Sequence, residues 1–310
     1  SKFISRIINL SGSSTEFSVN STTSGAQDSQ SVTDLTNGGF VVTWSSYDQD
    51  GSGYGIFAQI YDSNGSKSGD EFQVNTHQSD NQQEPAVTSL DGGGFVVAWE
   101  SNKQDGANYG IYGQIFDQDG EKSGNEFKIN TYTSSNQTYS SVTTLSDNTF
   151  VVTWISDGQD GSRYGIYSQL FKHNGTKIGE EFRVNSHTTG TQERPVVTSL
   201  NDGFIVVWDG PGTGDESGIY GQIYNNSGEK IGDGAQFLIN TYTNSGQYRP
   251  NAAGLNDGTF VVTWDASNHS LDSNWGIIGQ VFKHNGAKIG DEFRVNTETN
   301  SYQWTSSIIK

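Results

Sequence analysis

The sequence predicts an all-β protein with the fold of a β-propeller. Two observations carry this prediction: a phrase returns about every 55 residues, and each copy contains four strand-like runs. The composition agrees, because only 31% of the 310 residues are apolar, aromatic residues reach 12%, and Gly, Ser, Asn, Thr and Asp are abundant. Turn formers and strand formers therefore outnumber helix formers.

The repeat keeps its register along the whole chain. The phrase "EFxVN", or a close variant, places a Phe at intervals of 55, 55, 55, 55 and 56 residues, at Phe17, Phe72, Phe127, Phe182, Phe237 and Phe293. The phrase "FVVTW" recurs five times and ends at Trp44, Trp99, Trp154, Trp208 and Trp264. Six units of four strands predict about six blades. An extended β-solenoid is the alternative, although its coils are usually shorter than this repeat.

Four strands are expected in each unit, in a fixed order. The first resembles "PAVTSL" at 85–90, and an Asn-Gly or Asp-Gly turn, as at Asn37-Gly38, leads to the second, "GFVVTW". A polar loop containing Asp-Gly reaches the third, "YGIYGQIF", and a turn such as Asn64-Gly65 reaches the fourth, "EFRVN". The second strand is apolar on both faces, so we expect its Trp to pack between neighbouring blades.

The boundaries predict a single propeller domain over residues 1–310. A partial repeat spans 1–34, further repeats start near 35, 90, 145, 200 and 255, and a final strand covers 303–310. One blade is thus expected to be incomplete and closed by strands from both termini, leaving room for a partner strand. The chain contains no Met and no apolar stretch long enough for a signal peptide, which predicts a piece processed from a longer precursor.

Charge excludes several classes of partner. The net charge of −18 and the pI near 4.4 repel phosphate backbones and anionic lipid, so we expect no nucleic-acid partner. No apolar run is long enough to span a bilayer, so we expect no membrane insertion. Without Cys there is no disulfide and no thiolate site.

Acidic, glycine-containing loops are the candidate metal sites. Carboxylate and carbonyl oxygens on a flexible loop are the ligands that Ca²⁺ prefers. The candidate ligands are Asp48, Asp50, Asp105, Asp157 and Asp160. The fourth and fifth repeats change the loop to "DGPGTGDESG" and "DASNHSLDSNWG", and a solvated turn is the alternative interpretation.

Sugar binding is the second candidate chemistry. Aromatic faces stack on sugar C–H groups, and planar amides bond to paired hydroxyls. The candidate ligand-binding residues are Tyr54, Tyr109, Tyr164, Trp275, Gln59, Gln114, Gln169, Gln222 and Gln280. For the glutamines, the alternative is that they satisfy backbone groups between blades.

Catalysis has little support in the sequence. No His accompanies a recognisable nucleophile motif, and paired carboxylates such as Asp70-Glu71 recur with the repeat, whereas an active site is normally one constellation. We therefore expect a protein that is not an enzyme. A propeller enzyme with its site in a central funnel is the lesser alternative.

The phrase "DGGGFVVAWES…QDGANYGIYGQIFDQDGEKSGNEFKINTYT" resembles a repeat of very large bacterial surface and secreted proteins, often found alongside haemolysin-type calcium-binding or cadherin-like modules. The resemblance covers nearly the whole chain. It implies an extracellular or cell-surface setting, adhesion or ligand binding, and calcium dependence. It supplies no catalytic residues.

These observations predict an extracellular, multivalent, lectin-like protein that binds glycans or a glycosylated surface. Weak repeated sites gain strength through avidity, which would give the repetition a function. The alternative is a structural or adhesive module, stabilised by calcium, that assembles with a partner through its incomplete blade.

Overall fold

The computed structural model describes residues 4–6, 16–106, 108–232, 234–298 and 301–308, and these residues form β-strands and no helix. They belong to two compact units, residues 1–133 with 173–176, and residues 134–172 with 177–310. The predicted all-β class is therefore confirmed.

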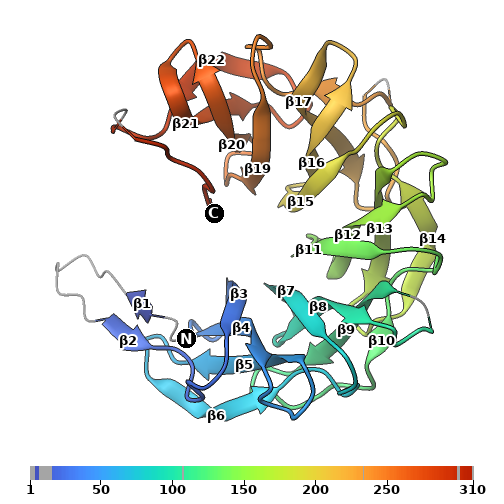
Figure 1. The fold of residues 1–310 in the computed structure, drawn as a ribbon, viewed down its shortest axis with the longest axis vertical. Coiled ribbons are helices and arrows are strands. Elements are labelled where there is room, and N and C mark those ends of the chain that lie inside the picture. The colour runs from blue at the N-terminus through green and yellow to red at the C-terminus, as the bar shows by residue number, and fades with distance from the viewer. Residues whose placement is uncertain (1–3, 7–15, 107, 233, 299–300, 309–310) are drawn as a thin grey trace. The chain divides into compact units, whose positions relative to one another are not determined.

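The first unit holds two four-stranded antiparallel sheets and one two-stranded sheet (Figure 1). The two-stranded sheet pairs β1 (Ile4–Arg6) with β2 (Glu16–Ser18). The next sheet runs β3 (Gln27–Asp34), β4 (Phe40–Tyr47), β5 (Tyr54–Tyr61) and β6 (Lys67–Gln73). The third runs β7 (Gln82–Ser89), β8 (Phe95–Asn102), β9 (Tyr109–Phe116) and β10 (Phe127–Lys128).

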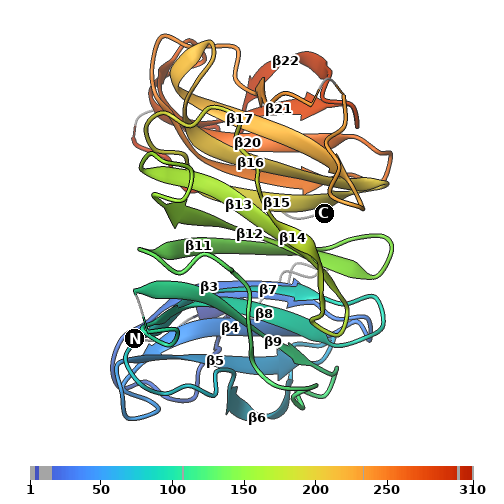
Figure 2. The ribbon, with the colours of Figure 1, turned by 90° about the vertical axis from the view of Figure 1, so that its right-hand side faces the viewer.

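The second unit holds three four-stranded sheets of the same order. The first runs β11 (Gln137–Thr144), β12 (Thr149–Asp157), β13 (Tyr164–Lys172) and β14 (Lys177–Arg183). The second runs β15 (Glu193–Leu200), β16 (Gly203–Gly212), β17 (Asp215–Asn225) and β18 (Phe237–Leu238). The third runs β19 (Gln247–Gly254), β20 (Phe260–His269), β21 (Asp272–Phe282) and β22 (Lys288–Arg294). The side view shows β15, β16 and β17 running alongside one another (Figure 2).

Each sheet is a meander, as the four strand-like runs predict. The turn at Asn37-Gly38 shows the mechanism, because Gly38 has φ 83°, a conformation that a residue without Cβ adopts cheaply. The Gly38 N–H donates to Leu35 O at 2.9 Å and closes the β3–β4 hairpin. The repeated Asn-Gly and Asp-Gly pairs therefore set the hairpin register.

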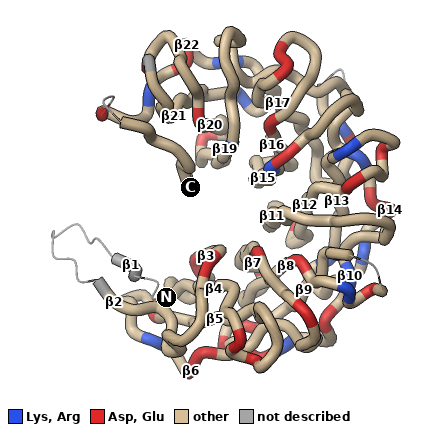
Figure 3. Tube along the Cα trace, in the orientation of Figure 1, with Lys and Arg blue, Asp and Glu red and all other residues tan. Residues whose placement is uncertain are grey.

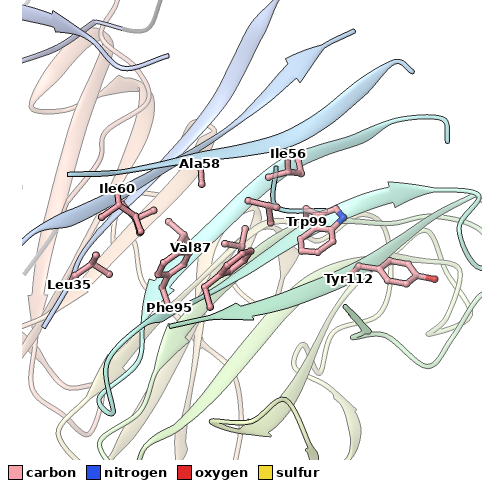
Figure 4. Close-up of a cluster of buried hydrophobic side chains, with 12 residues drawn as sticks. Leu35, Ile56, Ala58, Ile60, Val87, Phe95, Trp99 and Tyr112 are labelled. Carbon is pink, nitrogen blue, oxygen red and sulfur yellow. The ribbon is translucent and has the colours of Figure 1, made fainter. Parts of the chain in front are cut away.

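The second strand of every sheet is buried on both faces. All five Trp side chains at the end of the "FVVTW" phrase are 0% exposed. Trp99 of β8 packs in one cluster with Ile56 and Ala58 of β5, in the preceding sheet of the same unit (Figure 4). The predicted role between sheets is thus confirmed for Trp99, Trp208 and Trp264. Burying each aromatic side chain contributes roughly 2–3 kcal/mol.

Six blades are not confirmed, and the closure of one blade by both termini stays a prediction. Five four-stranded sheets form in the described residues, where about six blades were expected. The expected strand at 303–310 is absent over the described residues 301–308, and 309–310 lie outside the described residues. Strands β1 and β2 pair only with each other among the described residues, so no sheet there combines strands from both termini.

An irregularity in the first hairpin of every sheet positions the charged residues discussed below. The ladder slips after the first residue of β15, between Glu193 and Val196, and after the second residue of β3, β7, β11 and β19. One residue at each slip has a positive φ, at Ser29, Glu84, Tyr139, Arg194 and Arg249. A β-bulge of this kind re-aims side chains.

Candidate active site

Charged side chains of the second unit meet at the first hairpins of its last two sheets. Arg194 and Arg249 are the bulge residues of β15 and β19, each with φ 50°. Glu193 lies directly opposite Asp209 in the β15–β16 ladder, immediately before the bulge. The bulge directs the Arg194 side chain toward Glu193 and Asp209.

Glu193, Arg194 and Asp209 form one contact set. Nη1 of Arg194 lies 2.8 Å from Oδ2 of Asp209 and 3.4 Å from Oε2 of Glu193. Because both oxygens contact the same nitrogen, the two distances bound their separation at about 6 Å. The side chains of Glu193 and Arg194 are 31% and 37% exposed, whereas that of Asp209 is 6% exposed. The set therefore has a solvent side and a buried side.

Arg249 continues this set into the last sheet. Its backbone N–H donates to Oδ1 of Asp209 at 3.2 Å, and its Nη1 donates to Oδ2 of Asp265 at 3.3 Å. The backbone N–H of Thr305 donates to both oxygens of Asp265, at 2.9 and 3.1 Å. Asp209 and Asp265 are thus joined through one arginine, which fixes both carboxyl groups.

Burial dominates the electrostatics of the two aspartates. Burial raises the pKa of Asp209 to about 7, and Glu193 raises it further, while the Arg194 guanidinium and the Arg249 N–H oppose the shift. Burial also raises the pKa of Asp265, against hydrogen bonds from Thr305 and Arg249. Asp209 can therefore hold or release a proton near neutral pH.

The contact set is unique among the repeats, and the sequence analysis missed it. The residue after the Trp of "FVVTW" is Ser45, Glu100, Ile155, Asp209 or Asp265, and the residue before the bulge is Asp28, Gln83, Thr138, Glu193 or Tyr248. Only the fourth repeat has carboxyl groups at both positions. The prediction relied on residues that recur in every repeat, so it overlooked the two carboxyl groups found in one repeat. Comparing the residue at each position across the repeats identifies them.

The five predicted glutamines are buried in the third strands. Gln59, Gln114, Gln169, Gln222 and Gln280 are at most 1% exposed. Each donates from Nε2 to the backbone carbonyl of the next residue, and three also donate to the fourth strand, as Gln59 does to Gly69 O at 3.1 Å. Gln114 donates to Gly124 O, which precedes the fourth strand. Gln59 sits where the β5–β6 ladder slips. The structure thus gives these glutamines the backbone-satisfying role and removes them from the ligand set.

The predicted aromatic residues have different surroundings. Tyr54, Tyr109 and Tyr164 are half-buried at the start of the third strands, and Tyr164 packs against the core of the second unit. The Tyr54 hydroxyl lies 3.4 Å from Oδ2 of Asp28, and burial together with that carboxylate raises the pKa of Tyr54. Trp275 contacts other aromatic rings, which are described below.

Four of the five predicted calcium ligands have partners within the protein. Asp50 accepts from the Ser52 N–H and from Gln73, Asp105 pairs with Lys128 at 2.8 Å, and Asp157 bonds to Ser135. Asp160 repeats the turn of Asp50 by accepting from the Ser162 N–H, and Asp48 has φ 60°. Across the described ranges, no three His, Asp or Glu side chains are grouped to hold a metal ion. Calcium binding stays a prediction.

Several solved structures similar to this chain are glycoside hydrolases. An α-L-arabinofuranosidase from Fusarium graminearum has a TM-score of 0.56 and 14% identity, over 80% of this chain and 79% of its own. An α-L-arabinofuranosidase from Lactobacillus brevis has a TM-score of 0.52 and 12% identity, over 88% and 96%. A thermostable family-43 glycoside hydrolase has a TM-score of 0.53 and 10% identity, over 92% and 98%. The fold is that of a β-propeller.

These comparisons overturn two expectations. The chain was expected to be a lectin-like or adhesive module and not an enzyme, but the proteins that share its fold almost end to end are glycoside hydrolases. At 10–14% identity the likeness shows the fold alone, so the reaction is taken up as a proposal below. No protein-family model matches the chain, and no curated protein matches it.

No helix long and apolar enough to cross a membrane occurs in the part of the chain that the structure describes. The extracellular setting, the resemblance to bacterial surface repeats and the partner strand stay predictions.

Proposed function

We propose that the protein is a glycoside hydrolase whose reaction centre is Glu193 and Asp209. The observation that carries the proposal is the pair of carboxyl groups held by one arginine, found in one repeat only. Glycoside hydrolysis needs two carboxyl groups with different protonation, one of them an acid with a raised pKa. The fold shared with α-L-arabinofuranosidases supports the same reaction class.

Asp209 is the general acid in this proposal. Its pKa of about 7 leaves it protonated in a large share of molecules at neutral pH, as a proton donor to a leaving glycosidic oxygen requires. Its buried position is what maintains that proton. The substrate reaches Asp209 where the half-exposed Arg194 side chain moves aside, a rotamer change that is fast for exposed residues.

Glu193 is the partner carboxylate. Its side chain contacts Arg194 at 3.4 Å and is 31% exposed, so it can reach an anomeric carbon. The oxygen separation of at most about 6 Å fits the retaining arrangement of about 5–5.5 Å better than the inverting one of about 6.5–9.5 Å. Glu193 attacks the anomeric carbon as Asp209 protonates the departing oxygen, and water then cleaves the glycosyl ester while returning its proton to Asp209.

The test is hydrolysis of 4-nitrophenyl glycosides, including the α-L-arabinofuranoside, by the full chain. We expect turnover with retained anomeric configuration, and a loss of at least about 100-fold in kcat for Glu193→Gln and for Asp209→Asn. Asp202→Asn, an exposed carboxyl in the turn of the same hairpin, is the matched control and should keep full activity. The kcat/KM should fall as pH rises through about 7, the pKa of Asp209. Absence of turnover on every glycoside, or full activity in Glu193→Gln, would reject the proposal.

A further inference from the structure

Four aromatic rings of the second unit touch one another in a chain next to the charged residues. Tyr248 stacks on Trp275 with ring centroids 5.5 Å apart, Trp275 meets Trp304 edge-on at 6.3 Å, and Trp304 stacks on Tyr302 at 6.0 Å with 16° between the planes. These four side chains, Tyr248, Trp275, Tyr302 and Trp304, are called the aromatic surface.

The aromatic surface is open on one side. Tyr302 is 63% exposed and Trp304 is 58% exposed, while Tyr248 and Trp275 are half-buried beneath them. Soluble proteins rarely leave contiguous large rings in water without a use for them. Two nearly parallel, exposed rings supported by two others form an exposed apolar surface.

The segment that carries the outer rings is held in place. Gln303 N–H donates to Trp275 O at 3.0 Å, and the Gln303 side chain accepts from Asn296 at 3.1 Å. Ser306 bonds through its hydroxyl to Thr263 at 2.9 Å and through its carbonyl to Asn251 at 3.3 Å. The rings are therefore fixed before any ligand arrives, which lowers the entropic cost of binding.

The aromatic surface adjoins the proposed reaction centre through a continuous set of hydrogen bonds. Tyr248 lies opposite Asp265 in the β19–β20 ladder and precedes Arg249, which bonds to Asp209. Trp304 precedes Thr305, whose N–H bonds to Asp265. Glu193 and Tyr248 precede the bulge residues of their strands, and Trp304 holds the equivalent sequence position before Thr305, whose φ of 62° is also positive. One carboxylate followed by two rings occupies equivalent positions.

We propose that the aromatic surface binds a neutral oligosaccharide, whose sugar rings stack on it beside Glu193 and Asp209. This inference rests on the proposed function and names its substrate class. Aromatic faces pack on the C–H groups of sugar rings, and exposed polar groups around them accept and donate to hydroxyls. A charged glycan is disfavoured, because the net charge is −18 and both nearby arginines are already paired with aspartates.

The experiment measures binding and catalysis separately. The double variant Tyr302→Ala/Trp304→Ala and the control Phe293→Ala, which removes an exposed ring from the opposite edge of the same sheet, are compared with the parent chain. Affinity electrophoresis in gels containing arabinan, arabinoxylan or polygalacturonate is run in a Glu193→Gln background. KM and kcat on arabino-oligosaccharides are measured with Glu193 intact.

We expect the neutral polysaccharides, and not polygalacturonate, to retard the Glu193→Gln chain. The double variant should lose that retardation and raise KM about tenfold, with kcat changed less than about twofold. Phe293→Ala should behave like its parent.

The remaining outcomes separate the two proposals. Retardation that depends on the aromatic surface, in a chain that hydrolyses nothing, would reject the proposed reaction and support the surface. Hydrolysis with KM and retardation unchanged in the double variant would overturn the surface and leave the reaction standing. Loss of self-association in the double variant without any change in glycan retardation would show a protein interface and also overturn the proposal.

Discussion

At the scale of single residues, Asp209 decides the chemistry of the proposed centre. Its carboxyl group contacts a guanidinium at 2.8 Å, which would ordinarily lower the pKa, yet burial outweighs that contact and raises the pKa to about 7. The backbone N–H of Arg249 fixes the other oxygen. Ionising a carboxyl group buried in this way lowers the free energy of unfolding.

This decrease predicts a pH dependence of stability. Asp209 has a folded-state pKa above its unfolded value of 3.8, so the native chain binds more protons between those pH values. The contribution is fully present below pH 3.8 and is lost as pH rises through about 7. Asp209→Asn removes this loss, so its free energy of unfolding relative to wild type should rise between pH 4 and pH 8, by something on the order of 4 kcal/mol.

Urea unfolding at the two pH values measures this difference. Asp257→Asn is the control, because Asp257 is exposed and hydrogen bonds from Thr259 lower its pKa, so its effect should be small and of the opposite sign. Parallel pH profiles for Asp209→Asn and wild type would contradict the shifted pKa.

At the scale of elements, the Asn of the "VN" phrase joins three segments of each repeat. In the second unit, Asn185 Oδ1 accepts from the Ile166 N–H at 2.8 Å, and its Nδ2 donates to His187 O at 2.8 Å and Gln192 Oε1 at 3.0 Å. These bonds join the third strand of the repeat, the crossing loop and Gln192, which immediately precedes the first strand of the next repeat. Buried amides with several partners carry more stability than exposed ones.

Removing this amide should destabilise the whole chain. Asn185→Ala leaves the Ile166 N–H, the His187 carbonyl and the Gln192 amide without their partner, and we expect a loss of about 2–4 kcal/mol of unfolding free energy. Asn285→Ala, at an exposed turn with one bond to the Ala287 N–H, should cost less than about 1 kcal/mol. Equal losses of unfolding free energy for the two variants in chemical denaturation would show that Asn185 contributes no more to stability than an exposed turn asparagine.

The strands were predictable because their signals are local. Alternating apolar runs, Asn-Gly turns and the apolar "FVVTW" strand each act within a few residues, and the structure confirms them. The bulges were not predictable, because Arg194 and Tyr139 adopt a left-handed φ that only tertiary contacts impose on residues other than Gly. The bulges bring the site residues together, so the geometry of the site could not be predicted even though its residues can be read from the sequence.

At the scale of the whole molecule, the net charge of −18 attracts any cation to the protein, whether or not a specific site exists. Acidic positions are distributed along the chain (Figure 3). Screening alone raises the stability of an acidic chain, so a test of calcium binding has to separate a specific site from ionic strength. Magnesium at the same concentration provides that separation, because it has the same charge and demands a tighter octahedral geometry.

The calcium prediction is therefore a difference in melting temperature between two divalent ions. If the Asp-Gly loops bind Ca²⁺, a concentration of about 100 times the Kd adds roughly 2.7 kcal/mol per site, which raises the Tm by about 4 °C per site over the value in Mg²⁺. The triple variant Asp50→Asn/Asp105→Asn/Asp160→Asn should abolish this difference whatever its own Tm, since only the response to calcium is compared. Equal melting temperatures of the wild-type chain in Ca²⁺, Mg²⁺ and EDTA at matched ionic strength would contradict calcium binding. These carboxylates would then serve only in contacts within the protein, such as Asp50 with the Ser52 N–H and Asp105 with Lys128.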